Sequence, residues 1–195
     1  TLIGEILASA YRAGKVFVAG NIGRAVSGIA LSARENDICV LEISSFQLEN
    51  IEDFRPDVAV YLNLRSDHLD WYPAIAEYRA AKDRIFANMR PQDAAVLNLD
   101  DTVCRELAEE LNGPRVVTVA AGGRADYTLN ADYTPEMLEA VKSPENLLSA
   151  VAACELCGLS RAEILPVLRA FRGLPHRIEK VGEIRGVSFW NDSKA

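Results

Sequence analysis

Two kinds of hydrophobic pattern take turns along the chain. Apolar residues between positions 2 and 10 recur with helical spacing, which predicts that the chain opens within a helix. Runs that are apolar almost throughout predict buried strands at residues 16–19, 38–43, 58–62, 94–97 and 116–119. Helices are predicted near residues 25–33, around Lys82 and at residues 102–111. Such strands, with helices between them, indicate an α/β fold: a mostly parallel sheet with helices on both faces.

The last third of the chain departs from this alternation. Residues 127–143 have a poor pattern and predict a loop with a short helix. The helices predicted after it span residues 145–157 and 161–171. The turn Gly173-Leu174-Pro175 ends that region. Residues 178–190 then alternate on either side of Arg185-Gly186, which predicts a hairpin at the start of a new structural unit.

Polar clusters follow several of the predicted strands. They lie at residues 20–23, 42–47, 63–70 and 98–101. Ligands of parallel sheets bind at the carboxyl ends of the strands, so these clusters are candidate binding segments. The first three follow consecutive strands and are expected to converge on one cleft. The fourth, with Asp100-Asp101, is expected to cap a helix.

Lys82 lies in the middle of an otherwise apolar helix stripe. The residues that share its face are Ile75, Tyr78, Ile85, Phe86 and Met89. A lysine on that face loses hydration, so its pKa should fall. The neutral amine can then face a metal or react with carbon dioxide to give a carbamate. The alternative is a lysine whose ammonium extends to the rim of the core.

Two further residues suit a cation site. Glu42 ends an apolar strand, where a carboxylate has to be hydrated, paired or bound to a cation. His68 is one of two histidines and precedes the helix of Lys82. A carboxylate, an imidazole and a lysine carbamate form a hard ligand set suited to Mg²⁺, which commonly binds phosphate oxygens. The alternative is a loop histidine and a glutamate that caps a strand.

Composition narrows the class of partner. The chain has 195 residues, 49% hydrophobic and 25% charged, enough for one good-sized domain or for one domain and part of another. Its net charge is −7, its pI is near 5.0, and it has no Lys/Arg run. These values argue against nucleic acid and against an anionic membrane surface, and favour small-molecule partners. No apolar run approaches the about 20 residues that cross a bilayer.

The four cysteines indicate reduced thiols in a cytoplasmic protein. None has metal-site spacing with a second pair or with a histidine. Cys154 and Cys157 form a C-x-x-C pair, but the alanine-rich run around them predicts a helix. Small buried side chains are therefore expected there rather than redox chemistry.

A phosphate-binding loop of the form G-x-x-x-x-G-K-[ST] does not occur in the sequence. The first residues have the pattern of the helix into which such a loop would lead. We therefore expect the loop to precede Thr1 in a longer chain.

Six runs carry a resemblance to a known family. They are Gly20-Asn21-Ile22-Gly23, the nine residues 41–49 (LEISSFQLE), Asp67-His68-Leu69-Asp70, Tyr78-Arg79-Ala80-Ala81-Lys82, Gly173-Leu174-Pro175-His176-Arg177 and Asn191-Asp192-Ser193-Lys194-Ala195. In this order they resemble the Mur ligases, over nearly the whole chain. The runs at 44–49 and 173–177 favour the member that joins D-glutamate to UDP-N-acetylmuramoyl-L-alanine over its siblings and over folylpolyglutamate synthase.

The resemblance implies a three-domain, cytoplasmic, ATP-dependent amide ligase of peptidoglycan synthesis. Residues 1–172 would be most of the central ATP-binding domain, and residues 173–195 the first strands of the C-terminal domain. The substrate carboxylate would be activated by ATP to an acyl phosphate, and the amine of D-glutamate would then displace phosphate. A non-catalytic module that binds a nucleotide or UDP-sugar, or another Mur or folylpolyglutamate ligase, is the alternative.

The resemblance also implies roles for matched residues. Glu42 would hold one Mg²⁺ with the ATP phosphates, and His68 and carbamylated Lys82 a second. The residues expected to contact the UDP-linked substrate are Asn21, Ser44 and Gln47, with loop caps as the alternative. Those expected to contact ATP are Asn146 at adenine, Asp192 at the ribose, and Arg177 and Lys194 at the phosphates. Lys142-Ser143 replace the family's usual His-Asn before the alanine-rich helix, so the role of that loop is open.

Overall fold

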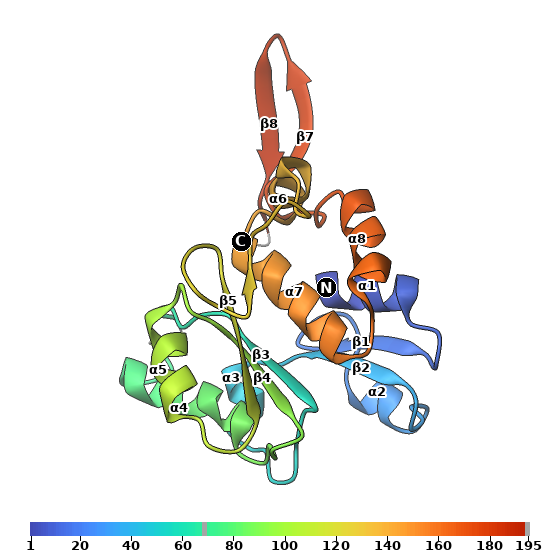
Figure 1. The fold of residues 1–195 in the computed structure, drawn as a ribbon. Helices are drawn as coiled ribbons and strands as arrows, with labels where there is room; N and C mark the ends of the chain where they lie inside the picture. Colours follow the sequence, from blue (N-terminus) through green and yellow to red (C-terminus); the bar gives the residue numbers. More distant parts are fainter. Residues whose placement is uncertain (68–69, 194–195) are drawn as a thin grey trace.

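Parallel strands form the centre of the computed structural model, which describes residues 1–67 and 70–193 (Figure 1). A two-stranded parallel sheet pairs β1 (Val16–Gly20) with β2 (Ile38–Glu42). A four-stranded parallel sheet has the order β3-β4-β5-β6, with bounds Val58–Tyr61, Ala94–Asn98, Arg115–Ala120 and Tyr127–Thr128. The predicted α/β fold with parallel strands is confirmed. The parallel strands lie in two sheets, since β2 and β3 are not hydrogen-bonded to each other within the described chain.

The long helix α7 (Pro144–Leu156) is the centre of the main core. Its residues 147–154 are all buried, because β3, β4 and β5 cover one side while α1 (Leu2–Ala10) and α8 (Arg161–Ala170) cover others. The alanines of this helix allow its neighbours to approach closely, and Ala150 and Ala152 lie in the same apolar cluster as Ile6 of α1. In Figure 1, α7 runs between the larger sheet and the pair α1 and α8.

The opposite face of the larger sheet is covered by α4 (Ile75–Asp83), by the short 3₁₀ helix Arg84–Phe86 and by α5 (Thr102–Glu110). Tyr61, Phe86 and Leu107 form part of this second core. Helices therefore cover both faces of the larger sheet, as predicted. No helix in the described part of the chain is long and apolar enough to cross a membrane.

Helix ends follow the chemistry of their capping residues. The Asp101 carboxylate caps α5 by accepting hydrogen bonds from the backbone N–H groups of Val103 and Cys104, at 3.0 and 3.1 Å, which confirms the predicted cap. The segment predicted as loop and short helix contains β6 and α6 (Pro135–Val141). Two helices span only four residues each, fewer than an isolated helix needs to be stable: α2 (Ser27–Ala30) and α3 (Ser45–Leu48). Helix α2 was predicted to be longer.

The C-terminal strands form the predicted hairpin. Strands β7 (Glu179–Ile184) and β8 (Val187–Asn191) pair antiparallel and project away from the rest of the described chain (Figure 1). Arg185 and Gly186 make the turn with positive φ angles of 51° and 80°, the conformation that matches the twist of a two-residue hairpin. The apolar residues Ile184 and Val187 beside this turn are exposed. The proposed domain boundary before Gly173 stays a prediction.

Arg161 joins α8 to two other segments. Its guanidinium donates to the Glu155 carboxylate at 2.7 Å and to the Tyr133 hydroxyl at 2.8 Å, and it lies over the rings of Tyr127 and Tyr133 at 5.7 and 5.8 Å. The Tyr127 hydroxyl donates to the other oxygen of Glu155 at 2.8 Å. Both charged side chains are mostly buried, with exposed fractions of 30% and 21%. This cluster therefore links α7 and α8 to β6.

We expect Arg161→Met to lower the free energy of unfolding by about 1–3 kcal/mol, because it leaves a mostly buried carboxylate without its charged partner. Burial pushes the pKa of Glu155 up, but hydrogen bonds from Arg161 and Tyr127 outweigh it, so the pKa is lowered overall. A carboxyl group whose pKa is lowered on folding stabilises the fold at pH values above its ordinary pKa. This stabilisation is lost as the pH falls through the lowered pKa. The difference in unfolding free energy between Arg161→Met and the unaltered protein, measured by urea unfolding, should therefore be smaller at about pH 3.5 than at about pH 7.

Arg169→Met is the matched control, since Arg169 lies on the same helix and its side chain has no hydrogen bond or ion pair within the described chain. It should change stability by less than about 0.5 kcal/mol. Equal effects of the two substitutions would contradict a stabilising role for the Arg161 cluster.

Candidate functional site

One pocket lies at the carboxyl ends of three strands. It has a volume of about 630 Å³ and is lined by Ile22 after β1, Glu42 at the end of β2 and Leu62 after β3. The first turn of α7 and residues 171–178 form the other side. Two of the three polar segments predicted to converge, 20–23 and 42–47, therefore reach this pocket, whereas the third is represented only by the preceding residue Leu62 and its convergence stays a prediction.

Four of the predicted site residues line this pocket. They are Glu42, Asn146, Arg177 and Asp192. Asn146 lies on the first turn of α7, whereas Arg177 and Asp192 flank the hairpin. The Asp192 carboxylate accepts a hydrogen bond from the backbone N–H of Ile178 at 3.0 Å, which ties the two ends of the hairpin together. The Arg177 side chain has no hydrogen bond or ion pair within the described chain and is available to an anion.

Glu42 has the chemistry of a cation ligand. Its side chain is exposed at the pocket, and its Oε1 accepts a long hydrogen bond of 3.4 Å from the Asn21 amide. No described residue donates to its second oxygen. A hard carboxylate oxygen at this position fits Mg²⁺.

Lys82 lies near the end of α4, half-buried between two tyrosine rings. Its Nζ is 5.2 Å from the ring centroid of Tyr61 and 5.6 Å from that of Tyr78. Burial lowers the pKa of the Lys82 ammonium, although neighbouring acidic groups oppose the shift. The expected inward position is therefore seen, while Ile75 of the same stripe is 43% exposed. Carbamylation of Lys82 stays a prediction.

The predicted metal ligands are not all seen together. Lys82 does not line the pocket that holds Glu42. The predicted residues His68 and Lys194 lie outside the described residues. Among residues 1–67 and 70–193, no three His, Cys, Asp or Glu side chains lie close enough to share a metal ion.

Ser44 and Gln47 cap the short helix α3. The Gln47 N–H donates to the Ser44 hydroxyl oxygen at 3.4 Å, and the Gln47 amide oxygen accepts from the Ser44 N–H at 2.9 Å and from its hydroxyl at 3.1 Å. This reciprocal arrangement is a capping box. The two side chains thus have the capping role named as the alternative, and their contact with substrate stays a prediction, as does that of Asn21.

The structure contains an aromatic cluster near Lys82 that the predicted site residues did not include. Phe46 meets Trp71 edge-on at 5.6 Å and stacks on Tyr72 at 5.8 Å, and Tyr72 lies 5.3 Å from Tyr78. The Tyr72 hydroxyl also donates to the Glu49 carboxylate. The adjacent aromatic residues at 71 and 72 were the only local signal in the sequence, and their contact with α3 depends on the fold.

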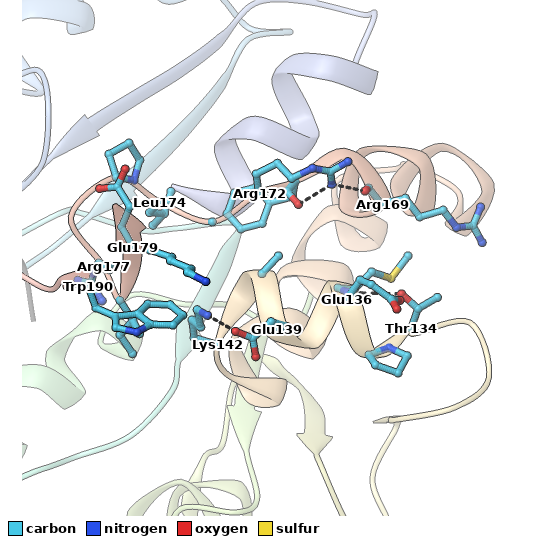
Figure 2. Close-up of a pocket in the computed structure, with 18 residues that line it drawn as sticks. Thr134, Glu136, Glu139, Lys142, Arg169, Arg172, Leu174, Arg177, Glu179 and Trp190 are labelled. Carbon is cyan, nitrogen blue, oxygen red and sulfur yellow. Dashed lines mark hydrogen bonds and ion pairs between the residues drawn. The ribbon is translucent and has the colours of Figure 1, made fainter. Parts of the chain in front are cut away.

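Lys142 and Ser143 each have a structural role. Lys142 lines the pocket drawn in Figure 2, which lies between α6, α8 and the hairpin and has a volume of about 1170 Å³. Lys142 ends α6 with a left-handed φ of 66°, pairs with Glu139, and places its Nζ 5.3 Å from the Trp190 ring. The Ser143 hydroxyl oxygen accepts from the Asn146 N–H at 3.2 Å and so caps α7. The departure from the family pattern thus forms a junction between two helices and the hairpin.

The C-x-x-C cysteines are unpaired. Cys154 is fully buried in the core, and burial raises the pKa of its thiol to about 12. Burial also raises the pKa of Cys157. Both thiols are therefore protonated near neutral pH, when they are poor nucleophiles.

Comparison with known proteins places the chain in a family. The sequence profile of the Mur ligase middle domain matches residues 1–155. A UDP-N-acetylmuramoylalanine--D-glutamate ligase of Geotalea uraniireducens is 40% identical over 212 residues, and one of Acidobacterium capsulatum is 40% identical over 213. Each match covers 100% of this chain and 46% of the relative, so the chain spans about half the length of these curated relatives.

Solved structures agree on the fold. MurF from Acinetobacter baumannii matches with a TM-score of 0.72 and 18% identity, over 98% of this chain and 47% of that chain. MurF ligase from Thermotoga maritima, solved in complex with ADP, matches with a TM-score of 0.72 and 19% identity, over 98% of this chain and 50% of that chain.

Proposed function

The chain belongs to the Mur ligase family, and we propose that it is part of an ATP-dependent ligase that joins D-glutamate to UDP-N-acetylmuramoyl-L-alanine in the cytoplasm. The observation that carries this proposal is the pocket that brings Glu42, Asn146, Arg177 and Asp192 together from distant parts of the sequence. The identity to ligases of that name over the whole chain supports the choice of substrates. Residues 1–172 form most of the central domain and residues 173–195 begin the C-terminal domain.

The reaction begins with transfer of the terminal phosphoryl group of ATP to the carboxylate of the alanyl substrate. The amine of D-glutamate then attacks the acyl phosphate, a C–N bond forms, and inorganic phosphate leaves. Asn146 contacts the adenine, Asp192 the ribose, and Arg177 the phosphates, where its unpaired guanidinium matches a phosphate in charge and geometry. Lys194 is assigned to the phosphates by its motif alone.

Two cation positions complete the proposed site. Glu42 holds one Mg²⁺, and His68 and carbamylated Lys82 hold the other. Bound Mg²⁺ neutralises the negative charge that keeps a carboxylate away from a phosphoryl group. Asn21 supports the first position by its hydrogen bond to Glu42. Tyr61 and Tyr78 confine the Lys82 side chain, and so limit the positions that its terminal nitrogen can take.

The experiment is ADP release by the complete protein that carries this chain, measured with both substrates and with each omitted. Glu42→Gln keeps the size of the side chain but removes its charge. It should lower turnover by about a hundredfold or more and raise the Mg²⁺ concentration required for half-maximal rate. Glu35→Gln is the control, because Glu35 is exposed in a loop and does not line the pocket.

Turnover and Mg²⁺ dependence that are unchanged in Glu42→Gln would contradict the assigned role. Binding of ADP by the unaltered protein with no turnover under any combination of substrates would favour the non-catalytic module instead.

A further inference from the structure

The hairpin and the residues at its base form one hydrogen-bonded unit. The backbone N–H of Ile178 donates to the Asp192 carboxylate at 3.0 Å, and the Asn191 amide nitrogen lies 2.8 Å from Nδ1 of His176. These two bonds tie the segment before β7 to the end of β8 and the residue that follows it. Residues 176–192 are therefore expected to move together, and are called the hairpin unit below.

The hairpin unit is attached to the rest of the chain at few points. The chain reaches it from α8 through Gly173, which has a left-handed φ of 93°. A side chain at Gly173 would come within 3.2 Å of the Ala140 carbonyl oxygen, so glycine allows a close passage beside α6. Within the described chain, one hydrogen bond, ion pair or ring contact joins the unit to residues before Gly173: Lys142 Nζ lies 5.3 Å from the centroid of the Trp190 ring (Figure 2).

Lys142 has a fixed position of its own. It ends α6 with a φ of 66° and pairs with Glu139, and its side chain is only 26% exposed. The next residue, Ser143, caps α7 through its bond from the Asn146 N–H. The contact with Trp190 therefore connects the hairpin unit to the start of the helix on which Asn146 lines the pocket of about 630 Å³.

We propose that Lys142 is a positioning residue, which acts through Trp190 to hold Arg177 and Asp192 in place for ATP. Arg177 and Asp192 belong to the hairpin unit and line the same pocket as Asn146. The angle between the unit and α7 therefore sets the distance between these two groups and Asn146. This inference rests on the proposed function for the identity of the ligand, whereas the contact itself is independent of it.

The size of the effect follows from the strength of the contact. An ammonium over the face of an exposed aromatic ring shifts an equilibrium by roughly two- to fivefold. Without that contact the hairpin unit can turn about the segment at Gly173, and a smaller fraction of the molecules has Arg177 and Asp192 in position. The apparent affinity for a nucleotide falls by that fraction.

The test is binding of ADP to the complete ligase by isothermal titration calorimetry, with the KM for ATP measured in parallel. Lys142→Met keeps the length of the side chain but removes its charge, and should raise both constants by roughly two- to fivefold. Trp190→Leu should have the same effect, and the double variant should be no weaker than either single variant, because all three lose one contact. Lys142→Arg should restore both constants, since a guanidinium also lies favourably over a ring.

Lys180→Met is the matched control. Lys180 lies opposite Trp190 in the register of the hairpin and pairs with Glu183 of the same strand, so its charge does not join the unit to α6. This substitution should leave ADP affinity and the KM for ATP unchanged.

ADP affinity unchanged in Lys142→Met would overturn the inference while leaving the proposed function intact. Additive losses in the double variant, no recovery in Lys142→Arg, or an equal loss in Lys180→Met would also overturn it. If the unaltered ligase does not bind ADP, the proposed function itself is wrong, and this inference with it.

Discussion

Replacing Lys82 with arginine should lower turnover of the complete ligase by about a thousandfold or more, although the positive charge is kept. A guanidinium cannot form a carbamate, so the substitution removes the negatively charged oxygens that Lys82 is proposed to supply. It also places a wider group between the rings of Tyr61 and Tyr78, which confine the native side chain.

The environment of Lys82 favours the carbamate. Burial lowers the pKa of its ammonium, so more of the amine is neutral at a given pH. The neutral amine attacks carbon dioxide, a C–N bond forms and a proton is released. At a fixed concentration of carbon dioxide the carbamate should therefore increase as the pH rises through the lowered pKa of Lys82.

The carbamate can be observed directly by carbon-13 NMR of the complete ligase in labelled bicarbonate. The unaltered ligase should give a carbamate signal that grows with pH and is absent from Lys82→Arg. Lys15→Arg is the control, because Lys15 is exposed and far in sequence from the site. Turnover of Lys82→Arg within tenfold of the unaltered enzyme would refute the role.

The 195-residue chain alone should neither hydrolyse ATP nor ligate D-glutamate at a measurable rate. Its sequence contains no G-x-x-x-x-G-K-[ST] loop to hold the phosphates. Glu42 belongs to the smaller sheet and Lys82 to a helix on the larger, and no strand pairing in the described chain joins the two sheets. Positioning and charge stabilisation are each worth several powers of ten in rate, so losing both should abolish turnover.

A coupled ADP-release assay of the chain beside the complete ligase measures this directly. In the described chain β2 and β3 each have one edge without a strand partner, and such edges can pair with other chains, so we expect self-association in analytical ultracentrifugation. Turnover by the chain within tenfold of the complete ligase would contradict the proposed division of the catalytic parts.

Local patterns were enough to predict much of the fold. The apolar run of β4, the Asp101 cap of α5 and the Arg185-Gly186 turn depend on neighbours in sequence, and each is found as predicted. The separation of β2 from β3 depends on strand pairing between distant segments, which apolar runs do not encode.

The site was predictable in residue type more than in arrangement. The position of Glu42 at a strand end follows from the strand itself. The rings beside Lys82 come from β3 and α4, and only tertiary packing brings Tyr61 to the lysine. The contact of Lys142 with Trp190 likewise joins distant segments, and nothing in the sequence near either residue indicates it.

The junction between α6 and α7 consists of two residues, and both are helix caps. Lys142 ends one helix and Ser143 caps the next, so each residue there has a fixed backbone role. Adding or deleting one residue would change the direction in which α7 leaves α6, and would therefore move Asn146 relative to the pocket. The length of the junction therefore sets where α7 begins relative to α6. Related chains should vary in the residue types of this junction but keep its length.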